Sequence, residues 1–312
     1  MLVVLALGNN ALLRPGEPLD SAMRRGNVKG AAQAVAEVAR EHRVVLTHGN
    51  GPQVSLLGQA HTQMTAYTLD LLDAESEGMI GYLLEQELGR HLPRERLATL
   101  LTQVLVDPAD PAFSQPTKPV GPLYNETDAG RIARARGWTV APCGAGWRRV
   151  VPTPEPLRII ELATIRILVD HGIIVTCVGG GGIPVVPDEA GGLRGVEAVI
   201  DKDLAAALLA SELGADALVL LTDVDAVHEA WGTDEARQIG STTAAALRQL
   251  ALPPASMGPK VEALCRFVDS GGRLGAIGAL ADAAALVRGE AGTVVRGCTT
   301  GTHQLGSTGT AR

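Results

Sequence analysis

The chain has 312 residues, of which 46% are hydrophobic, 20% are charged and only 3% are aromatic. This composition is ordinary for a globular protein, and the length fits one large α/β domain or two smaller lobes. The formal net charge of −7 argues against a general nucleic-acid surface, because such surfaces carry an excess of Lys and Arg. Any phosphate that the protein binds must therefore be held by local groups.

The cysteines and histidines show neither a disulfide framework nor a metal site. The four cysteines lie far apart, so we expect reduced core thiols. The seven histidines include no i,i+4 pair and no His-x-Glu grouping. No stretch of about 20 apolar residues could span a bilayer, and the first residues read as a strand rather than as a secretory signal. We expect a cytoplasmic protein with no metal site of its own that binds neither membrane nor nucleic acid.

Short apolar runs alternate with helical patterns along most of the chain. Strands are expected at 2–7, 44–47, 173–178 and 217–221, each followed by a turn rich in Gly, Asn or Asp. Helices are expected at 28–40, 74–88, 155–170, 202–213 and 260–269. This alternation predicts a three-layer αβα sandwich around a mainly parallel sheet, with the site at the carboxyl ends of the strands.

The segment 107–156 breaks this rhythm, because it is rich in Pro, Gly and Trp and has little helical periodicity. Such a long irregular stretch is uncommon in a compact domain unless it forms a lid or a subdomain. We therefore predict one domain over 1–296, with a small protruding lid subdomain inserted at 107–156. The remaining residues, 297–312, are expected to form a C-terminal tail.

The turns that follow the expected strands are candidates for phosphate binding. Glycine lets a ligand approach the backbone, where N–H groups can converge on an anion. One such turn can equally serve only to pack a helix onto a strand, but four in one chain are a stronger signal. The chain contains no GxxxxGK[ST] and no GxGxxG, so P-loop, protein kinase and Rossmann sites lose their main support. The candidate phosphate-binding residues in these turns are Gly8, Asn9, Asn10, Gly49, Asn50, Gly51, Gly180 and Gly181.

Lys202 is flanked by two carboxylates, Asp201 and Asp203, at the start of an expected helix. Acidic residues in a first helical turn are also common for dipole reasons alone, so a solvated helix cap is the plain alternative. A lysine held by a carboxylate is, however, what a transferring phosphoryl group needs, because its charge spreads over several oxygens. Lys202 is therefore a candidate catalytic residue.

Two further lysines occupy unusual positions. Lys260 follows Pro259 at another expected helix start, where its charge opposes the helix dipole. Lys118 lies between two prolines within the segment 107–156, where a solvent-facing loop lysine is the plain alternative. Both lysines could meet a phosphate if the fold brings their segments together.

With these residues assembled, the chain resembles the carbamate kinase group of the amino acid kinase family from residue 2 to about residue 295. The resemblance is carried by THGNGPQV at 47–54, EGMIGY at 77–82, TKPVGP at 117–122, WRRVVP at 147–152, GGGGIP at 179–184, EAVIDKD at 197–203 and LTDVDAV at 221–227. It implies the amino acid kinase-like fold and reversible transfer of a phosphoryl group between ATP and carbamate, giving ADP and carbamoyl phosphate, with Mg²⁺. It also implies a homodimer and a place in arginine metabolism.

The resemblance also implies a role for each candidate residue. Lys202 would stabilise charge on the transferring group, Asp203 would position it, Lys260 would contact nucleotide phosphates, and Lys118 would reach in from the lid. The acceptor and the γ-phosphoryl group would be held by Gly8, Asn9, Asn10, Gly49, Asn50 and Gly51. The nucleotide pocket would be lined by Gly180, Gly181, Thr222, Asp223, Val224, Val227, Met257 and Pro259.

Three positions depart from the family pattern. Asn9 stands in place of a second glycine, His228 in place of a tyrosine, and Ala255 in place of a glycine. Asn enters the φ > 0 region at modest cost, so the first turn can keep its shape, with the Asn9 amide pointing away from the acceptor pocket or lending a donor. Two other functions stay open: a kinase for another small acid, and a weakly catalytic nucleotide-binding sensor.

Overall fold

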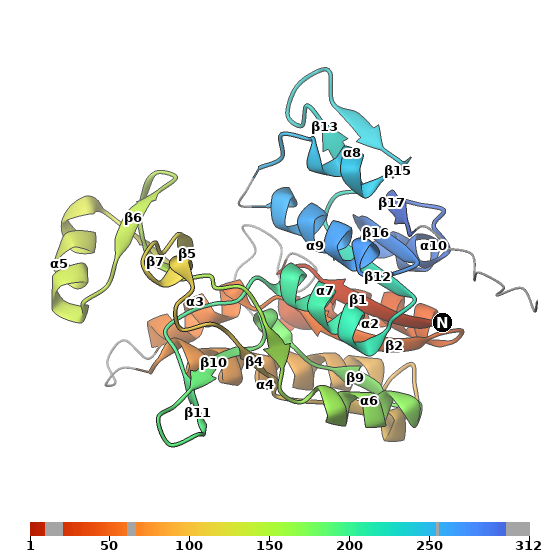
Figure 1. The fold of residues 1–312 in the computed structure, drawn as a ribbon, viewed down its shortest axis with the longest axis horizontal. Coiled ribbons are helices and arrows are strands. Elements are labelled where there is room, and N and C mark those ends of the chain that lie inside the picture. The colour runs from red at the N-terminus through yellow and green to blue at the C-terminus, as the bar shows by residue number, and fades with distance from the viewer. Residues whose placement is uncertain (10–20, 61–66, 254–255, 298–312) are drawn as a thin grey trace, which may run out of the picture.

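The computed structural model describes residues 1–9, 21–60, 67–253 and 256–297. Among these residues, the central sheet has eight strands in the order β15-β17-β16-β12-β1-β2-β9-β3 (Figure 1). All its neighbouring pairs are parallel except β16 with β17. Its strands are β1 (Leu2–Leu7), β2 (Arg43–His48), β3 (Leu97–Thr99), β9 (Ile174–Thr176), β12 (Ala217–Thr222), β15 (Ser241–Thr242), β16 (Leu274–Ala279) and β17 (Thr293–Arg296).

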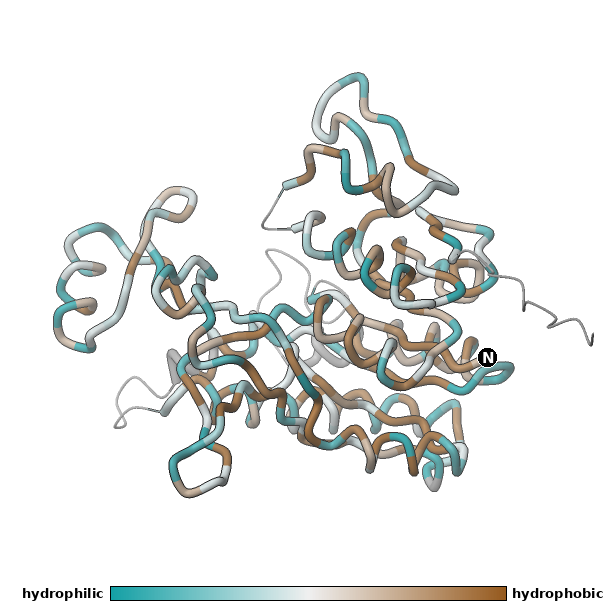
Figure 2. Tube along the Cα trace, viewed as in Figure 1, coloured by the Kyte–Doolittle hydropathy of each residue, from teal (hydrophilic) through white to brown (hydrophobic). Residues whose placement is uncertain are grey.

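Helices cover both faces of this sheet. One face is covered by α2 (Ser21–Ala39), α4 (Leu69–Leu88) and α10 (Ala283–Arg288), and the other by α6 (Leu162–Asp170), α7 (Lys202–Leu213) and α9 (Met257–Asp269). The other described α-helices are α3 (Gly51–Ala60), α5 (Glu126–Arg136) and α8 (Ala244–Arg248). Figure 2 shows hydrophobic residues concentrated in these layers.

Strand β1 shows how the sequence builds the sandwich. All its residues are buried, as expected of a central parallel strand that is covered on both faces. Its side chains alternate between the faces, so Val3 and Leu5 join the core beneath α2 and α4, whereas Val4 and Ala6 join the core beneath α7 and α9. The predicted three-layer α/β architecture around a mainly parallel sheet is confirmed.

One predicted helix is wrong in its first part. The helix expected at 155–170 begins at Leu162, and the residues before it include strand β8 (Arg158–Ile159). Pro156 lacks a backbone N–H and disfavours helical geometry at Glu155, while Ile159 is buried opposite Val104 of the neighbouring strand. Strand β8 belongs to a second sheet, in the order β11-β10-β4-β8, with β4 (Gln103–Leu105), β10 (Ile183–Pro187) and β11 (Leu193–Gly195).

The segment 107–156 contains a small separate sheet that projects from the layered body (Figure 1). Its antiparallel strands, in the order β5-β7-β6, are β5 (Lys118–Tyr124), β6 (Val140–Cys143) and β7 (Gly146–Val151). Helix α5 in this unit buries only Ala129 and depends on local signals, with Asn125 as N-cap and Gly137 in the left-handed C-cap conformation. We keep the division into a domain with an inserted lid as a proposal.

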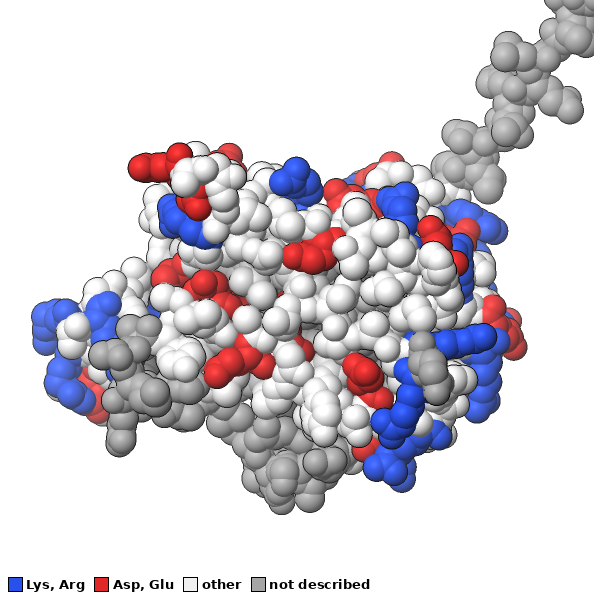
Figure 3. All heavy atoms as spheres, turned by 90° about the horizontal axis from the view of Figure 1, so that it is seen from below, with Lys and Arg blue, Asp and Glu red and all other residues white. Residues whose placement is uncertain are grey.

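A second projection is the two-stranded sheet of β13 (Val227–Glu229) and β14 (Arg237–Ile239) (Figure 1). None of the described helices is long and apolar enough to cross a membrane. Figure 3 shows one face of the molecule, on which acidic residues lie across the middle and basic residues lie chiefly toward the two ends. The described cysteines, Cys143, Cys177 and Cys265, are free, while Cys298 and nearly all of the expected tail lie outside the described residues.

The contact between α9 and β16 leaves no room for a side chain at Gly275. A Cβ there would lie 2.6 Å from Leu264 Cδ1, and Leu264 is fully buried and cannot swing away. We expect Gly275→Ala to lower the free energy of unfolding by about 1–3 kcal/mol, the usual cost of overpacking a core. Urea unfolding followed by circular dichroism measures this change.

Gly30 provides the matched control. It lies on the exposed side of α2, and a Cβ there would meet nothing within 4 Å. Gly30→Ala should therefore raise the free energy of unfolding by about 0.5–1 kcal/mol, because alanine loses less backbone entropy in a helix. Equal changes of the same sign in the two variants would contradict the packing described for Gly275.

Candidate active site

A cavity of about 910 Å³ opens where strands β1, β2 and β12 end. The turns after these strands form its floor, and residues 118–122 of β5 reach it from the projecting unit. This is the edge where a parallel sheet with helices on both faces places its ligands. The predicted site residues that line the cavity are Gly8, Asn9, Gly49, Asn50, Gly51, Lys118, Gly180, Lys202, Asp203, Thr222, Asp223, Val224, Met257, Pro259 and Lys260.

Three predicted site residues are not among those that line the cavity. Gly181 has φ 107° and packs against the backbone of Ile200, and Val227 is fully buried with its N–H bonded to Thr293 Oγ1. Asn10 lies outside the described residues. Beside Val227, the neighbouring Ala226 and His228 face the cavity instead.

Two of the predicted lysines share one carboxylate. Lys202 Nζ donates to Asp203 Oδ1 at 2.5 Å, and Lys260 Nζ donates to Asp203 Oδ2 at 2.8 Å. Lys202 and Asp203 begin α7, whereas Lys260 lies in the first turn of α9, the adjacent helix on the same face of the sheet. The fold thus brings Lys260 to a neighbouring pair of charges whose carboxylate lies 57 residues earlier in the sequence.

Burial and mutual attraction set the protonation of this cluster. Burial raises the pKa of Asp203, but the two lysines outweigh burial and hold that pKa at about 2. Burial lowers the pKa of Lys202, Asp203 opposes this change, and the charge of Lys260 adds to it. The cluster therefore holds an ionised carboxylate between two ammonium groups, ready to meet an anion.

Lys118 joins the same site from the projecting unit. Its Nζ lies 3.3 Å from Asp201 Oδ2, while Asp201 Oδ1 caps α7 by accepting from the N–H groups of Asp203 and Leu204. The unit makes a second ion pair with the same segment, between Arg149 and Glu197. Two carboxylates in the residues that lead into α7 thus hold the projecting unit to the body.

A buried polar network lies behind the turn that follows β2, and sequence reasoning missed it. Asn50 Nδ2 donates to Asp73 Oδ1 at 2.9 Å and to Ser76 Oγ at 2.8 Å. Burial raises the pKa of Asp73 to about 8, although the Asn50 hydrogen bond lowers it. Burial also raises the pKa of Glu77 well above its usual value. The available signal was the set of polar residues at positions 73, 76 and 77, whose i, i+3 and i+4 spacing places them on one face of the helix, the face that is buried.

The Asn9 side chain lies against the turn of residues 49–51. A Cβ placed on Gly49 would fall on the Asn9 amide, and one placed on Gly51 would lie 3.3 Å from Asn9 Nδ2. The amide thus stays at the edge of the cavity, beside the candidate phosphate-binding turn. Gly49 is required here because Asn9 already fills the space above it.

Comparison with known proteins identifies the family. The sequence pattern of the amino acid kinase family matches residues 1–278. A carbamate kinase from Rhizobium meliloti is 54% identical over 301 residues, covering 95% of this chain and 93% of the relative. A carbamate kinase from Haemophilus influenzae is 48% identical, covering 94% of this chain and 96% of the relative. The carbamate kinase from Giardia lamblia bound to AMP-PNP superposes with a TM-score of 0.87 at 37% identity, covering 95% of this chain and 98% of that one.

The chain therefore belongs to the amino acid kinase family. Within that family it falls in the carbamate kinase group, and it is an enzyme of that group.

Because His48 is buried, we expect the protein to lose stability as the pH is lowered. Its Nδ1 donates to the Gly49 carbonyl at 3.1 Å, and burial, aided by Lys202, lowers its pKa to about 4. The unfolded chain takes up a proton below pH 6.5, whereas the folded chain takes it up only near pH 4. The free energy of unfolding therefore falls over this window, by about 3 kcal/mol at most. His48→Gln should remove this contribution, which urea unfolding at pH 7 and pH 4.5 measures.

The exposed His91 serves as the control for this measurement. His91→Gln should show the same loss of stability as the wild type between the two pH values, because acid groups elsewhere are common to all variants. An unchanged acid loss in His48→Gln would contradict the low pKa of His48.

Proposed function

We propose that the protein catalyses reversible transfer of a phosphoryl group between ATP and carbamate, giving ADP and carbamoyl phosphate. The observation that carries this proposal is the convergence of Lys118, Lys202 and Lys260, with Asp203, on one cavity lined by glycine turns. Relatives named carbamate kinase, up to 54% identical, support the choice of acceptor.

The cavity has two sides that suit the two substrates. The end of β12 and the start of α9 contribute Thr222, Val224 and Met257, which would line the nucleotide pocket. The turns after β1 and β2 line the other side of the cavity and would hold the γ-phosphoryl group and the acceptor. The N–H groups of Gly8 and Gly49 themselves donate to the carbonyls of Leu221 and Leu7, so any backbone donors would come from the residues that follow them. The likeness to a relative bound to AMP-PNP supports a nucleotide on one side.

The transfer itself needs positioning and charge more than covalent chemistry. A carbamate oxygen attacks the γ-phosphorus of ATP, and the bond from that phosphorus to the β–γ bridging oxygen breaks, leaving ADP. Lys202 would stabilise the charge that spreads over the phosphoryl oxygens, and Lys260 would contact the nucleotide phosphates. Asp203 fixes both ammonium groups in place before substrate arrives.

Magnesium fits this site as a companion of the nucleotide. In the described part of the chain, no group of three or more His, Cys, Asp or Glu could hold a metal ion. Asp203 is shared by two lysines, and Asp201 caps α7 and pairs with Lys118. Asp223, which also accepts from Thr222 Oγ1, is the third carboxylate lining the cavity, and we propose that it would help to hold the ion. Phosphates with one or two carboxylates are the usual Mg²⁺ ligands in kinase sites. When bound, the ion would neutralise charge on the phosphate oxygens.

The homodimer and the place in arginine metabolism that the resemblance implies stay predictions. Sedimentation of the purified protein would measure the assembly directly.

The purified enzyme should form ATP from ADP and carbamoyl phosphate, and Lys202→Ala should lower kcat by roughly 100-fold or more. A donor that serves mainly the transition state contributes to kcat more than to ground-state binding, so affinity for ADP should change much less. A luciferase assay for ATP and a calorimetric titration with ADP measure the two effects. A variant that keeps a third of wild-type kcat would remove Lys202 from this role, and a wild type that binds ADP without turnover would favour a sensor.

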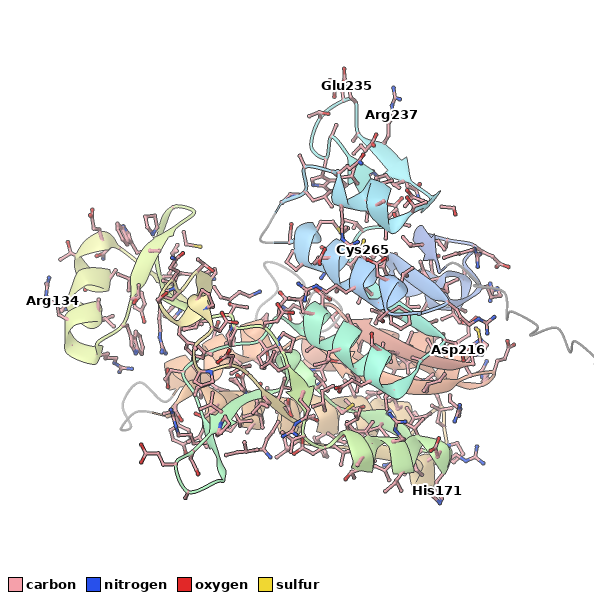
Figure 4. All side chains as sticks on the ribbon, viewed as in Figure 1. Arg134, His171, Asp216, Glu235, Arg237 and Cys265 are labelled. Atoms are coloured by element: carbon pink, nitrogen blue, oxygen red, sulfur yellow. The ribbon has the colours of Figure 1, made fainter. Side chains whose placement is uncertain are left out.

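Lys118→Ala tests the lid. Lys118 reaches the cavity only through the attachment of the projecting unit, so its loss should depress turnover at least tenfold while ADP binding stays nearly intact. Arg134→Ala is the control within the same unit, since Arg134 points outward from α5 (Figure 4). An equal loss of ADP affinity in Lys118→Ala would assign this lysine to the nucleotide pocket instead.

A further inference from the structure

Asn50 is held in one orientation by two acceptors. It is 7% exposed, lines the cavity and immediately precedes α3. Its amide nitrogen donates to Asp73 Oδ1 and to Ser76 Oγ, both on α4, which uses the two amide hydrogens. The Ser76 hydroxyl already donates to the Asp73 carbonyl at 2.9 Å, so it offers Asn50 only a lone pair. A flipped amide would place its oxygen against that lone pair, so the orientation is fixed.

The opposite side of the amide rests on Gly180. A Cβ at Gly180 would fall on the Asn50 amide, and the positive φ of 67° at this residue brings its backbone against that amide. Within the described part of the chain, Asn50 Oδ1 accepts no hydrogen bond. It is also not one of the solvent-inaccessible polar atoms that lack a partner. The nitrogen is turned toward α4, so the oxygen is the polar atom that Asn50 presents to the cavity.

An acceptor at this position does not suit a phosphate. Phosphoryl and carboxylate oxygens are themselves acceptors, and the donors that suit them in this cavity are the ammonium groups of Lys118, Lys202 and Lys260. An amide oxygen beside them instead calls for an N–H group on the ligand. Of the groups on carbamate and carbamoyl phosphate, only the amino group offers that donor.

We propose that Asp73 and Ser76 orient Asn50 so that its amide oxygen accepts a hydrogen bond from the amino group of the acceptor. This inference rests on the proposed function and concerns the selectivity of the same site. The contact separates carbamoyl phosphate from acetyl phosphate, which carries a methyl group where the amino group would be. A site built to pair a substrate N–H rejects the analogue that lacks it, because its own polar atom is left unpaired. Asp73 and Ser76 act through Asn50 and are positioning residues.

The test compares two phosphoryl donors with ADP. We expect the wild type to prefer carbamoyl phosphate over acetyl phosphate in kcat/KM, and Asp73→Ala to lower that preference about tenfold or more. Asp73→Asn keeps an oxygen that can accept from Asn50, so its preference should stay within about threefold of the wild type. The KM for ADP should be unchanged in both variants, since Asn50 lies on the acceptor side.

Ser76→Ala gives the same test with a smaller change, in case Asp73→Ala does not fold. It removes one of the two acceptors, and we expect the preference for carbamoyl phosphate to fall about threefold or more. A purely structural role would lower turnover with both donors equally and leave their ratio within twofold of the wild type, which would overturn the proposal.

The wild type separates this inference from the proposed function. A wild type that forms ATP from carbamoyl phosphate, with unchanged ratios in the variants, would overturn only the role of Asp73 and Ser76. A wild type that forms no ATP from carbamoyl phosphate would overturn both.

Discussion

The site depends on the ion pairs that the carboxylate of Asp203 makes with two lysines. Two ammonium groups buried side by side would repel each other and lose hydration, and an unpaired buried charge is costly. Asp203 accepts from both Lys202 and Lys260, and those lysines in turn keep it ionised. Charges of +2 and −1 leave a local excess of +1, which is available to an anionic substrate. Removing either lysine would raise the pKa of Asp203, and removing Asp203 would lower the pKa of Lys202.

The cluster costs stability at the starts of two helices. A helix N-terminus carries a partial positive charge, so Lys202 and Lys260 stand where local electrostatics are unfavourable for lysine. Asp201 offsets part of that cost by capping α7. The continuous apolar strands fix the positions of the helices that cover them. The lysines therefore stay at the helix starts although the local electrostatics there are unfavourable. Conflicts between local preference and overall fold are expected at functional sites.

Local signals decided which parts of this structure could be predicted from the sequence. Helix α7 has the expected bounds because Asp201 and Gly214 mark its two ends within the sequence itself. The partners of Asn50 could not be predicted, because they depend on which face of α4 meets the turn after β2. The same limit applies to Val227, since the sequence does not show which of two adjacent residues faces the cavity. The strand at Ile159 depends on a partner that is distant in the sequence, Val104.

The double use of Asp201 has a further consequence for proton affinity. Its charge raises the pKa of Lys202, and it also holds Lys118 of the projecting unit. Any movement that takes Lys118 away leaves the full negative charge of Asp201 facing Lys202, which then binds its proton more tightly. Under the lid proposal this coupling is reciprocal, so loss of the Lys202 proton would favour the contact between Lys118 and Asp201. The position of this unit and the pKa of Lys202 thus depend on the same carboxylate, that of Asp201.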